Sequence, residues 1–126
     1  MPLYTVSTPN ALSDAAQATL VQNITRIHCE ETGAPAQFVQ VIFSRGIRLR
    51  KGTKLHILGS IRAGRSEEIK QLLCGRFSEA AAQVLNCQKH ACNIELLDVP
   101  ASWVVEGGDV MPEPGQESAW LERNTC

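Results

Sequence analysis

The sequence predicts an α+β fold in which two tandem β-α-β units form a four-stranded mixed sheet with two helices on one face. A strand–helix–strand pattern occurs twice, and Ser66 caps the second helix 53 positions after Ser13 caps the first. Crossovers of this kind are right-handed, so each unit contributes two parallel strands. The length of 126 residues suits a single domain.

Within the domain 1–126, we place repeat one at 2–44, a basic loop at 45–54, repeat two at 55–98 and a C-terminal arm at 99–126. In repeat one, Leu3 to Thr8 is rich in β-formers, a helix runs from about Asp14 to Glu31, and 38–43 is the second strand. Apolar residues recur along this helix at helical spacing and predict its buried stripe: Ala16, Leu20, Ile24 and Ile27.

Repeat two follows the same plan, with strands at 55–61 and 92–97 and a helix from about Glu67 to Leu85. The predicted apolar face of this helix consists of Ile69, Leu72, Leu73, Phe77, Ala80, Ala81 and Val84. Since both helices cover one face of the sheet, the other face is bare, and we expect the chain to oligomerise through it. The arm is rich in Gly and Pro, so we expect an irregular segment that packs Trp103 and Trp120 on its own body or on a neighbour.

The composition is 44% hydrophobic and 20% charged, which is ordinary for a globular protein. The net charge of −1 argues against a general nucleic-acid binder. No apolar run approaches the ~18 residues of a membrane span, and we expect no secretion signal. An odd number of cysteines predicts free thiols in a reducing, cytoplasmic compartment: Cys29, Cys74, Cys87, Cys92 and Cys126. The spacing of Cys87, His90 and Cys92 fits no common zinc pattern, so we expect no metal.

Pro2 directly follows the initiator methionine and leads into the first strand. Initiator methionine is usually removed before a small residue, which would leave a proline with a free secondary amine. An α-amino group has an unperturbed pKa of about 7.7–8.0, so a modest shift leaves it neutral and able to act as a base or nucleophile. The alternative is that Pro2 only aids methionine removal and starts an edge strand.

Arg62 and Arg65 flank a glycine where a strand meets the N-terminus of the second helix. Guanidinium groups bind carboxylates in a bidentate way, and a helix N-terminus favours anions, so this segment predicts a carboxylate site. The alternative is that both arginines are solvated or pair with a neighbouring acid such as Glu67 or Glu68. In an antiparallel central strand pair, the Arg62 loop would return beside Pro2. An amine base would then face an anion site, as proton transfer α to a carboxylate requires.

Together these features resemble the tautomerase superfamily, and the cis-3-chloroacrylic acid dehalogenase branch in particular. The segments that carry the resemblance span nearly the whole chain in the family's order: Pro2–Thr5, Ile24–His28, Val39–Phe43, Arg62–Ser66, and Pro112–Glu117 with Trp120. The resemblance implies a 4-oxalocrotonate tautomerase or MIF-like fold, a homotrimer, catalysis by Pro2, a small carboxylate substrate and no cofactor.

The resemblance also implies roles for individual residues. Arg62 and Arg65 would hold the substrate carboxylate, and His28 would assist in binding it. Glu117 would activate water, unless the alignment slips by one residue and leaves Ser118 in its place. Without the resemblance, His28 reads as a polar residue near a helix end and Glu117 as a surface acid.

One position departs from the branch. The branch carries a tyrosine in a Glu-Tyr-Gly stretch that helps to orient water, and Gly107 replaces it here. A glycine supplies no hydroxyl donor. The single tyrosine of the chain, Tyr4, lies too near Pro2 in sequence to be a simple substitute.

Three functions follow, of which keto–enol tautomerisation of a small 2-oxo or enol carboxylate leads. The second is hydration, dehalogenation or decarboxylation of a three-carbon acid with Glu117 aiming water. The third is a non-catalytic trimeric binding module, which retention of Met1 would favour because Pro2 would then be an amide. The basic loop is either a solvated segment or a positive rim that steers anionic substrates; its charges are Arg45, Arg48, Arg50, Lys51 and Lys54.

Overall fold

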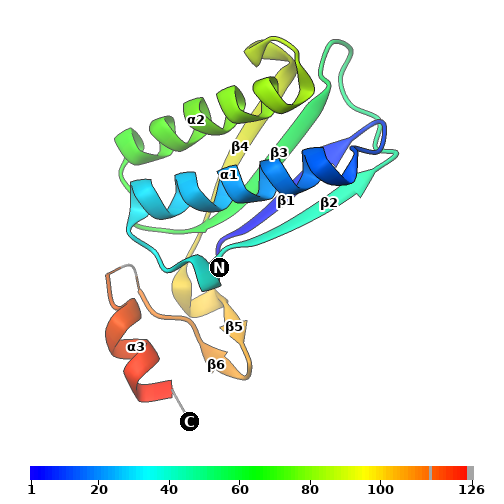
Figure 1. Ribbon diagram of the computed structural model, residues 1–126. Helices are drawn as coiled ribbons and strands as arrows, with labels where there is room; N and C mark the ends of the chain where they lie inside the picture. Colours follow the sequence, from blue (N-terminus) through cyan, green and yellow to red (C-terminus); the bar gives the residue numbers. More distant parts are fainter. Residues whose placement is uncertain (114, 125–126) are drawn as a thin grey trace.

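A computed structural model describes residues 1–113 and 115–124, without the side chains of residues 117 and 124. Four strands form one mixed sheet in the order β2-β1-β3-β4, and two long helices cover one of its faces (Figure 1). The predicted fold class is therefore confirmed. The elements of the two repeats are β1 (Leu3–Thr8), α1 (Asp14–Thr32), β2 (Gln40–Arg45), β3 (Leu55–Arg62), α2 (Glu67–Leu85) and β4 (Cys92–Val99).

The strand pairing follows the repeat. β1 pairs in parallel with β2, and β3 pairs in parallel with β4. The two repeats join through β1 and β3, which run antiparallel with Leu3 opposite Ser60 and Ser7 opposite His56. The amino end of β1 therefore lies beside the carboxyl end of β3.

Both helices begin at the predicted serines. Ser13 Oγ accepts a hydrogen bond from Ala16 N at 3.1 Å, and Ser66 Oγ accepts one from Ile69 N at 3.2 Å. Each cap satisfies one of the amide groups that a helix leaves unpaired at its first turn. α1 ends at Gly33, which adopts the left-handed conformation with a φ of 75°.

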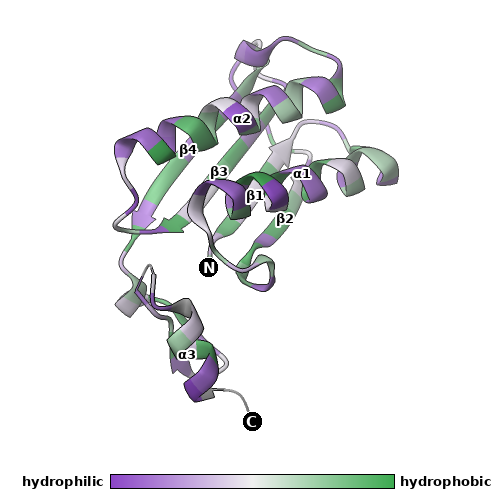
Figure 2. Cartoon of the chain, turned by 60° about the vertical axis from the view of Figure 1, so that its left-hand side comes forward, coloured by the Kyte–Doolittle hydropathy of each residue, from purple (hydrophilic) through white to green (hydrophobic). Residues whose placement is uncertain are grey.

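The core lies between the helices and the sheet, where the strands are mainly hydrophobic (Figure 2). The predicted stripe of α1 is buried at Leu20, Ile24 and Ile27. In α2 the prediction is wrong for Leu72, which is 51% exposed. Successive residues of a helix are about 100° apart, so Leu72 turns to solvent when Leu73 faces the sheet.

The second strand begins two residues later than predicted. Ala36–Phe38 forms a turn of 3₁₀ helix instead, and β2 starts at Gln40. Phe38 is buried, and its ring meets the ring of Trp120 edge-on with centroids 6.0 Å apart. Phe38 thus packs against the arm and does not belong to β2. Its apolar side chain, next to a β-rich run, explains why the sequence predicts strand at this position.

The arm is more regular than the sequence predicts, because two glycines close a hairpin. β5 (Val105–Glu106) pairs with β6 (Asp109–Val110) through Gly107 and Gly108, which have φ values of 60° and 86°. A 3₁₀ turn (Ala101–Trp103) precedes the hairpin, and helix α3 (Glu117–Asn124) follows it (Figure 1). The prediction of an irregular arm is therefore wrong.

The two tryptophans of the arm behave differently. Trp120 packs on the body of the chain, as predicted, and its Nε1 donates to Val110 O at 2.9 Å. Trp103 is 77% exposed, so it does not pack on its own chain. Packing of Trp103 on a neighbour stays a prediction.

The face of the sheet opposite the helices is open. Ile42 of β2 is 50% exposed and Leu97 of β4 is 54% exposed on the strands at its two edges. Among the described residues, no helix combines the length and the apolar character that crossing a membrane requires.

Candidate active site

Four element ends meet at one end of the sheet. Because β1 and β3 are antiparallel, the start of β1 and the end of β3 lie there together. The end of α1 and the start of α2 lie there as well, since Arg65 Nη1 donates to Thr32 O at 3.3 Å. The arm reaches the same place, with β5 below the amino terminus (Figure 1). The loop geometry inferred from the sequence thus brings Pro2 near Arg62 and Arg65.

The two arginines are held by backbone carbonyls. Arg62 is the last residue of β3 and is 3% exposed, and its Nη1 donates to Pro112 O at 2.6 Å. Arg65 directly precedes the cap of α2 and is half-buried. The alternative that both arginines are solvated is therefore wrong for Arg62. A guanidinium group carries five N–H donors in a fixed plane, a geometry that suits a carboxylate.

His28 is buried on the last turns of α1 and faces β1. It is 2% exposed, and its Nδ1 lies 2.6 Å from the hydroxyl of Tyr4, which is fully buried. The other ring nitrogen, Nε2, is also buried and has no hydrogen-bond partner in the described part of the chain. A buried polar group left in that state costs about 1–3 kcal/mol.

The pKa of His28 is lowered by burial and by nearby positive charges. Burial is the main cause that lowers the pKa of His28 to about 4, and the charges of Arg65, Arg62 and the amino terminus lower it further. His28 is therefore neutral at pH 7. All three positive groups are close enough to act on this ring.

The amino terminus is itself paired. Met1 is 7% exposed, and its amino group donates to Oε1 of Glu106 at 2.5 Å. Pro2 is buried at the start of β1, and its carbonyl accepts from Gln40 N at 3.0 Å. With Met1 in place the nitrogen of Pro2 is a peptide nitrogen. Three backbone bonds separate it from the Met1 nitrogen, so it lies within about 7 Å of the Glu106 carboxylate.

Sequence reasoning missed Glu106. It named Glu117, which begins α3 but whose side chain lies outside the described residues. In this hairpin the sequence analysis singled out only Gly107, which stands where the cis-3-chloroacrylic acid dehalogenase branch has a tyrosine. The one signal for Glu106 is its position directly before a Gly-Gly turn, which predicts a carboxylate at the end of a hairpin strand but not where that hairpin lies.

A cavity of about 410 Å³ opens beside the amino terminus, over the open face of the sheet. Met1 and Glu106 form part of its wall, and the other lining residues are Leu3, Gln40, Ser60, Val99, Trp103, Val104 and Val105. This volume fits a small organic acid.

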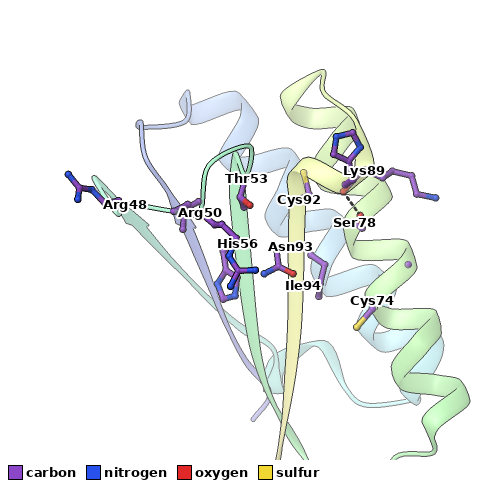
Figure 3. A pocket seen from close by; sticks show the side chains of 13 residues that line it. Arg48, Arg50, Thr53, His56, Cys74, Ser78, Lys89, Cys92, Asn93 and Ile94 are labelled. Carbon is purple, nitrogen blue, oxygen red and sulfur yellow. Dashed lines mark hydrogen bonds between the residues drawn. The ribbon is translucent and has the colours of Figure 1, made fainter.

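A larger cavity of about 880 Å³ lies at the opposite end of the sheet, where β3 and β4 begin. Arg48 and Arg50 of the basic loop border it, but Arg48 and Lys89 point away from each other (Figure 3). In a single chain the basic loop therefore does not border the amino terminus. Its role as a steering rim stays a prediction.

The cysteines are free thiols where the structure describes them: Cys29, Cys74, Cys87 and Cys92. Cys126 lies outside the described residues. Cys87 and Cys92 approach each other, with sulfur atoms 3.7 Å apart, and burial raises the pKa of Cys92 to about 12. Within residues 1–113 and 115–124, no three side chains gather in a way that could hold a metal ion.

The fold and the site define a class: a β-α-β repeat protein in which two arginines, a buried histidine and the amino terminus lie at one end of the sheet. No family model matches the sequence, and no curated protein matches it. Solved structures do match. N1, a member of the cis-3-chloroacrylic acid dehalogenase (cis-CaaD) family, superposes with a TM-score of 0.88 at 26% identity, covering 98% of this chain and 92% of its own.

Two further structures support the same assignment. Native fused 4-OT matches with a TM-score of 0.78 at 26% identity over 86% of this chain and 94% of its own. The protein crystallised as native Ps01740 matches with a TM-score of 0.75 at 32% identity over 82% of this chain and 99% of its own. The chain belongs to the tautomerase superfamily and is like its cis-CaaD branch.

The neutral state of His28 predicts a pH dependence of stability. The folded pKa of about 4 lies below the ordinary 6.5, so the unfolded chain binds a proton more readily between these values. The stability that neutral His28 provides is thus complete above pH 6.5 and is lost as the pH falls towards 4. We expect this residue to account for a loss of about 2 kcal/mol in the free energy of unfolding between pH 7 and 5.

Urea unfolding of the wild type and of His28→Gln at a series of pH values measures this effect. The variant should lose less stability than the wild type over this interval, whatever its stability at pH 7. Equal losses in the two proteins would show that His28 is not held neutral.

Proposed function

We propose that the chain is an amino-terminal-proline tautomerase that interconverts the enol and 2-oxo forms of a small carboxylate. The observation that carries this proposal is that the start of β1, Arg62 at the end of β3, Arg65 before α2 and His28 on the last turns of α1 lie together at one end of the sheet. An anion binds where positive charges gather in a partly buried pocket, because the low dielectric strengthens their attraction. The cavity beside the amino terminus is lined by Met1 and Glu106 rather than by these arginines, so the proposal puts the carboxylate end of the ligand beyond its described wall.

In the proposed mechanism, removal of Met1 frees the Pro2 nitrogen. The same removal enlarges the cavity, because Met1 forms part of its wall. Neutral Pro2 takes the hydroxyl proton of the enol and returns a proton to carbon, giving the 2-oxo acid. Arg62 and Arg65 hold the carboxylate and stabilise the oxyanion that develops during the transfer. The two nearby guanidinium groups also favour the neutral form of the amine.

Substitution of the proposed base, or of a proposed carboxylate-binding residue, should abolish the tautomerase activity. We expect Pro2→Ala and Arg65→Ala each to lower kcat/KM for ketonisation of phenylenolpyruvate at least ~100-fold, through loss of the oriented base or of the carboxylate clamp. Arg48→Ala is the matched control, since Arg48 lies at the other end of the sheet. The measurement is the loss of enol absorbance with time. Unchanged turnover in both site variants would remove Pro2 and Arg65 from the mechanism.

The intact mass of the protein decides between this enzyme and the binding module. Loss of one methionine leaves a basic nitrogen on Pro2. Full retention would keep the ion pair between Met1 and Glu106 and leave Pro2 an amide, which favours a non-catalytic module.

Glu106 favours a second candidate, which is hydration or dehalogenation of a three-carbon acid. The Glu106 carboxylate lies within about 7 Å of the Pro2 nitrogen, close enough for ordered water to bridge the two groups. A carboxylate in this place can accept a proton from that water as it attacks. The same carboxylate favours the protonated amine, which can act as an acid. Glu106 would thus supply the water-activating role that the resemblance gives to Glu117.

The two candidates respond differently to loss of this carboxylate. We expect Glu106→Gln to lower the rate of chloride release from cis-3-chloroacrylate at least ~100-fold and to change phenylenolpyruvate ketonisation much less, since only hydration needs a base for water. Glu113→Gln, which alters an exposed acid of the arm, is the control. Should both activities survive the change undiminished, Glu106 has no part in either reaction.

We also propose that the chain forms a homotrimer through the open face of its sheet. Two of the similar structures are fused 4-OT proteins crystallised as asymmetric trimers, and one of them is 25% identical to this chain. Ile42 and Leu97 supply apolar surface on this face that a single chain leaves about half exposed.

Sedimentation equilibrium should therefore give about three times the chain mass of 13.8 kDa. Ile42→Lys combined with Leu97→Lys should dissociate the assembly, because burying two lysine charges without partners is unfavourable. Leu72→Lys, on the exposed side of α2, should not. A monomeric wild type would contradict the proposal.

A further inference from the structure

Tyr4 and His28 form a buried polar pair whose geometry is fixed from several sides. The Tyr4 hydroxyl lies 2.6 Å from His28 Nδ1, and the two rings meet edge-on with centroids 5.6 Å apart. Phe77 of α2 meets the Tyr4 ring in the same manner at 4.9 Å. Gly59 leaves room for this ring, since a Cβ there would lie 2.5 Å from Tyr4 Cε1. Tyr4 therefore has one orientation.

The protonation states of the pair follow from its environment. Burial raises the pKa of Tyr4 well above its ordinary value, so the phenol keeps its proton. Burial and the surrounding cations lower the pKa of His28 to about 4, so the imidazole is neutral and carries one hydrogen. Only the tautomer of His28 is left to decide.

Hydrogen-bond accounting decides the tautomer. If Tyr4 donates to Nδ1, the ring hydrogen lies on Nε2, and this is the one polar hydrogen of the pair that the described residues leave unsatisfied. If Nδ1 donated to Tyr4 instead, the phenol hydrogen and the Nε2 lone pair would both lack partners there. Fewer unsatisfied groups favour the first arrangement.

We propose that Tyr4 is a positioning residue that locks His28 in the Nε2–H tautomer, so that the imidazole can only donate from Nε2. The role that the resemblance implies for His28, assistance in binding a substrate carboxylate, requires this tautomer. The inference rests on the proposed function, because the carboxylate ligand that would accept this hydrogen comes from that proposal. It also narrows the ligand class. An ionised carboxylate offers only acceptors to this donor, whereas the amide of the same acid carries no charge for the arginines and can present N–H groups.

The tautomer can be observed without any substrate. Long-range ¹H–¹⁵N spectra of the full-length protein at pH 7 should show the hydrogen of His28 on Nε2, with signals assigned through His56→Gln and His90→Gln. In Tyr4→Phe we expect a mixture of the two tautomers. Hydrogen on Nδ1 in the wild type, or an unchanged tautomer in Tyr4→Phe, would overturn the proposal.

Ligand binding tests the second half of the proposal. Pyruvate should shift the His28 Nε2–H resonance in the wild type, and pyruvamide at the same concentration should not. Equal shifts from both compounds would contradict the assignment of a carboxylate to this donor. Because these spectra need no turnover, they can uphold the role of Tyr4 even if the tautomerase proposal fails.

A double-mutant cycle separates positioning from a merely structural role. Tyr4→Phe should raise the KM for phenylenolpyruvate about tenfold, with a smaller change in kcat, because binding loses a fixed donor. In a His28→Gln background the same change should have little further effect, since Tyr4 acts through His28. An undiminished tenfold effect in that background would show that Tyr4 acts independently of the histidine.

Discussion

The antiparallel pairing of β1 with β3 is the constraint on which the site depends. It places the amino terminus beside the end of β3, where Arg62 lies, and it makes α1 and α2 meet with opposite ends. A strand rises about 3.3 Å per residue, so parallel pairing of these strands would have separated Pro2 from Arg62 by roughly 20 Å. The internal repeat therefore has a chemical consequence. Two like units related by a pseudo-twofold bring the head of one to the tail of the other.

The site concentrates groups that a stable core would avoid. Arg62 is buried, His28 is held neutral with one ring nitrogen unsatisfied in the described residues, and the amino terminus lies close to both. Burial of charged or unsatisfied polar groups opposes folding, although the hydrogen bond between Tyr4 and His28 also joins β1 to α1. Proteins break local rules of this kind mainly where a ligand completes the arrangement. In the proposed function, an anion that accepts the Nε2 hydrogen of His28 would do so here.

Much of the fold could be predicted because repeated local signals encode it. Ser13 and Ser66 marked both helix starts, and the β-rich runs gave the central strands. The predictions were wrong where tertiary contacts determine the position of a residue. Leu72 is apolar but faces away from the sheet, and Phe38 packs against Trp120 instead of joining a strand. Sequence alone suggested Arg62 and Arg65, while His28 needed the family resemblance. Glu106 could not be placed, because no periodicity says where a two-residue hairpin strand lies relative to the core.

The same nitrogen connects the two candidate reactions. Positive guanidinium groups favour a neutral amine, which is a base, whereas a nearby carboxylate favours a charged amine, which is an acid. Both kinds of group lie at this end of the sheet, with Arg62 and Arg65 from the second repeat and Glu106 from the arm. In both proposed reactions the repeats would supply the arginines that hold the substrate, and the hairpin would supply a carboxylate beside the amine. Loss of a tyrosine at Gly107 therefore does not by itself decide the chemistry, because the glycine turn is what closes the hairpin that carries Glu106.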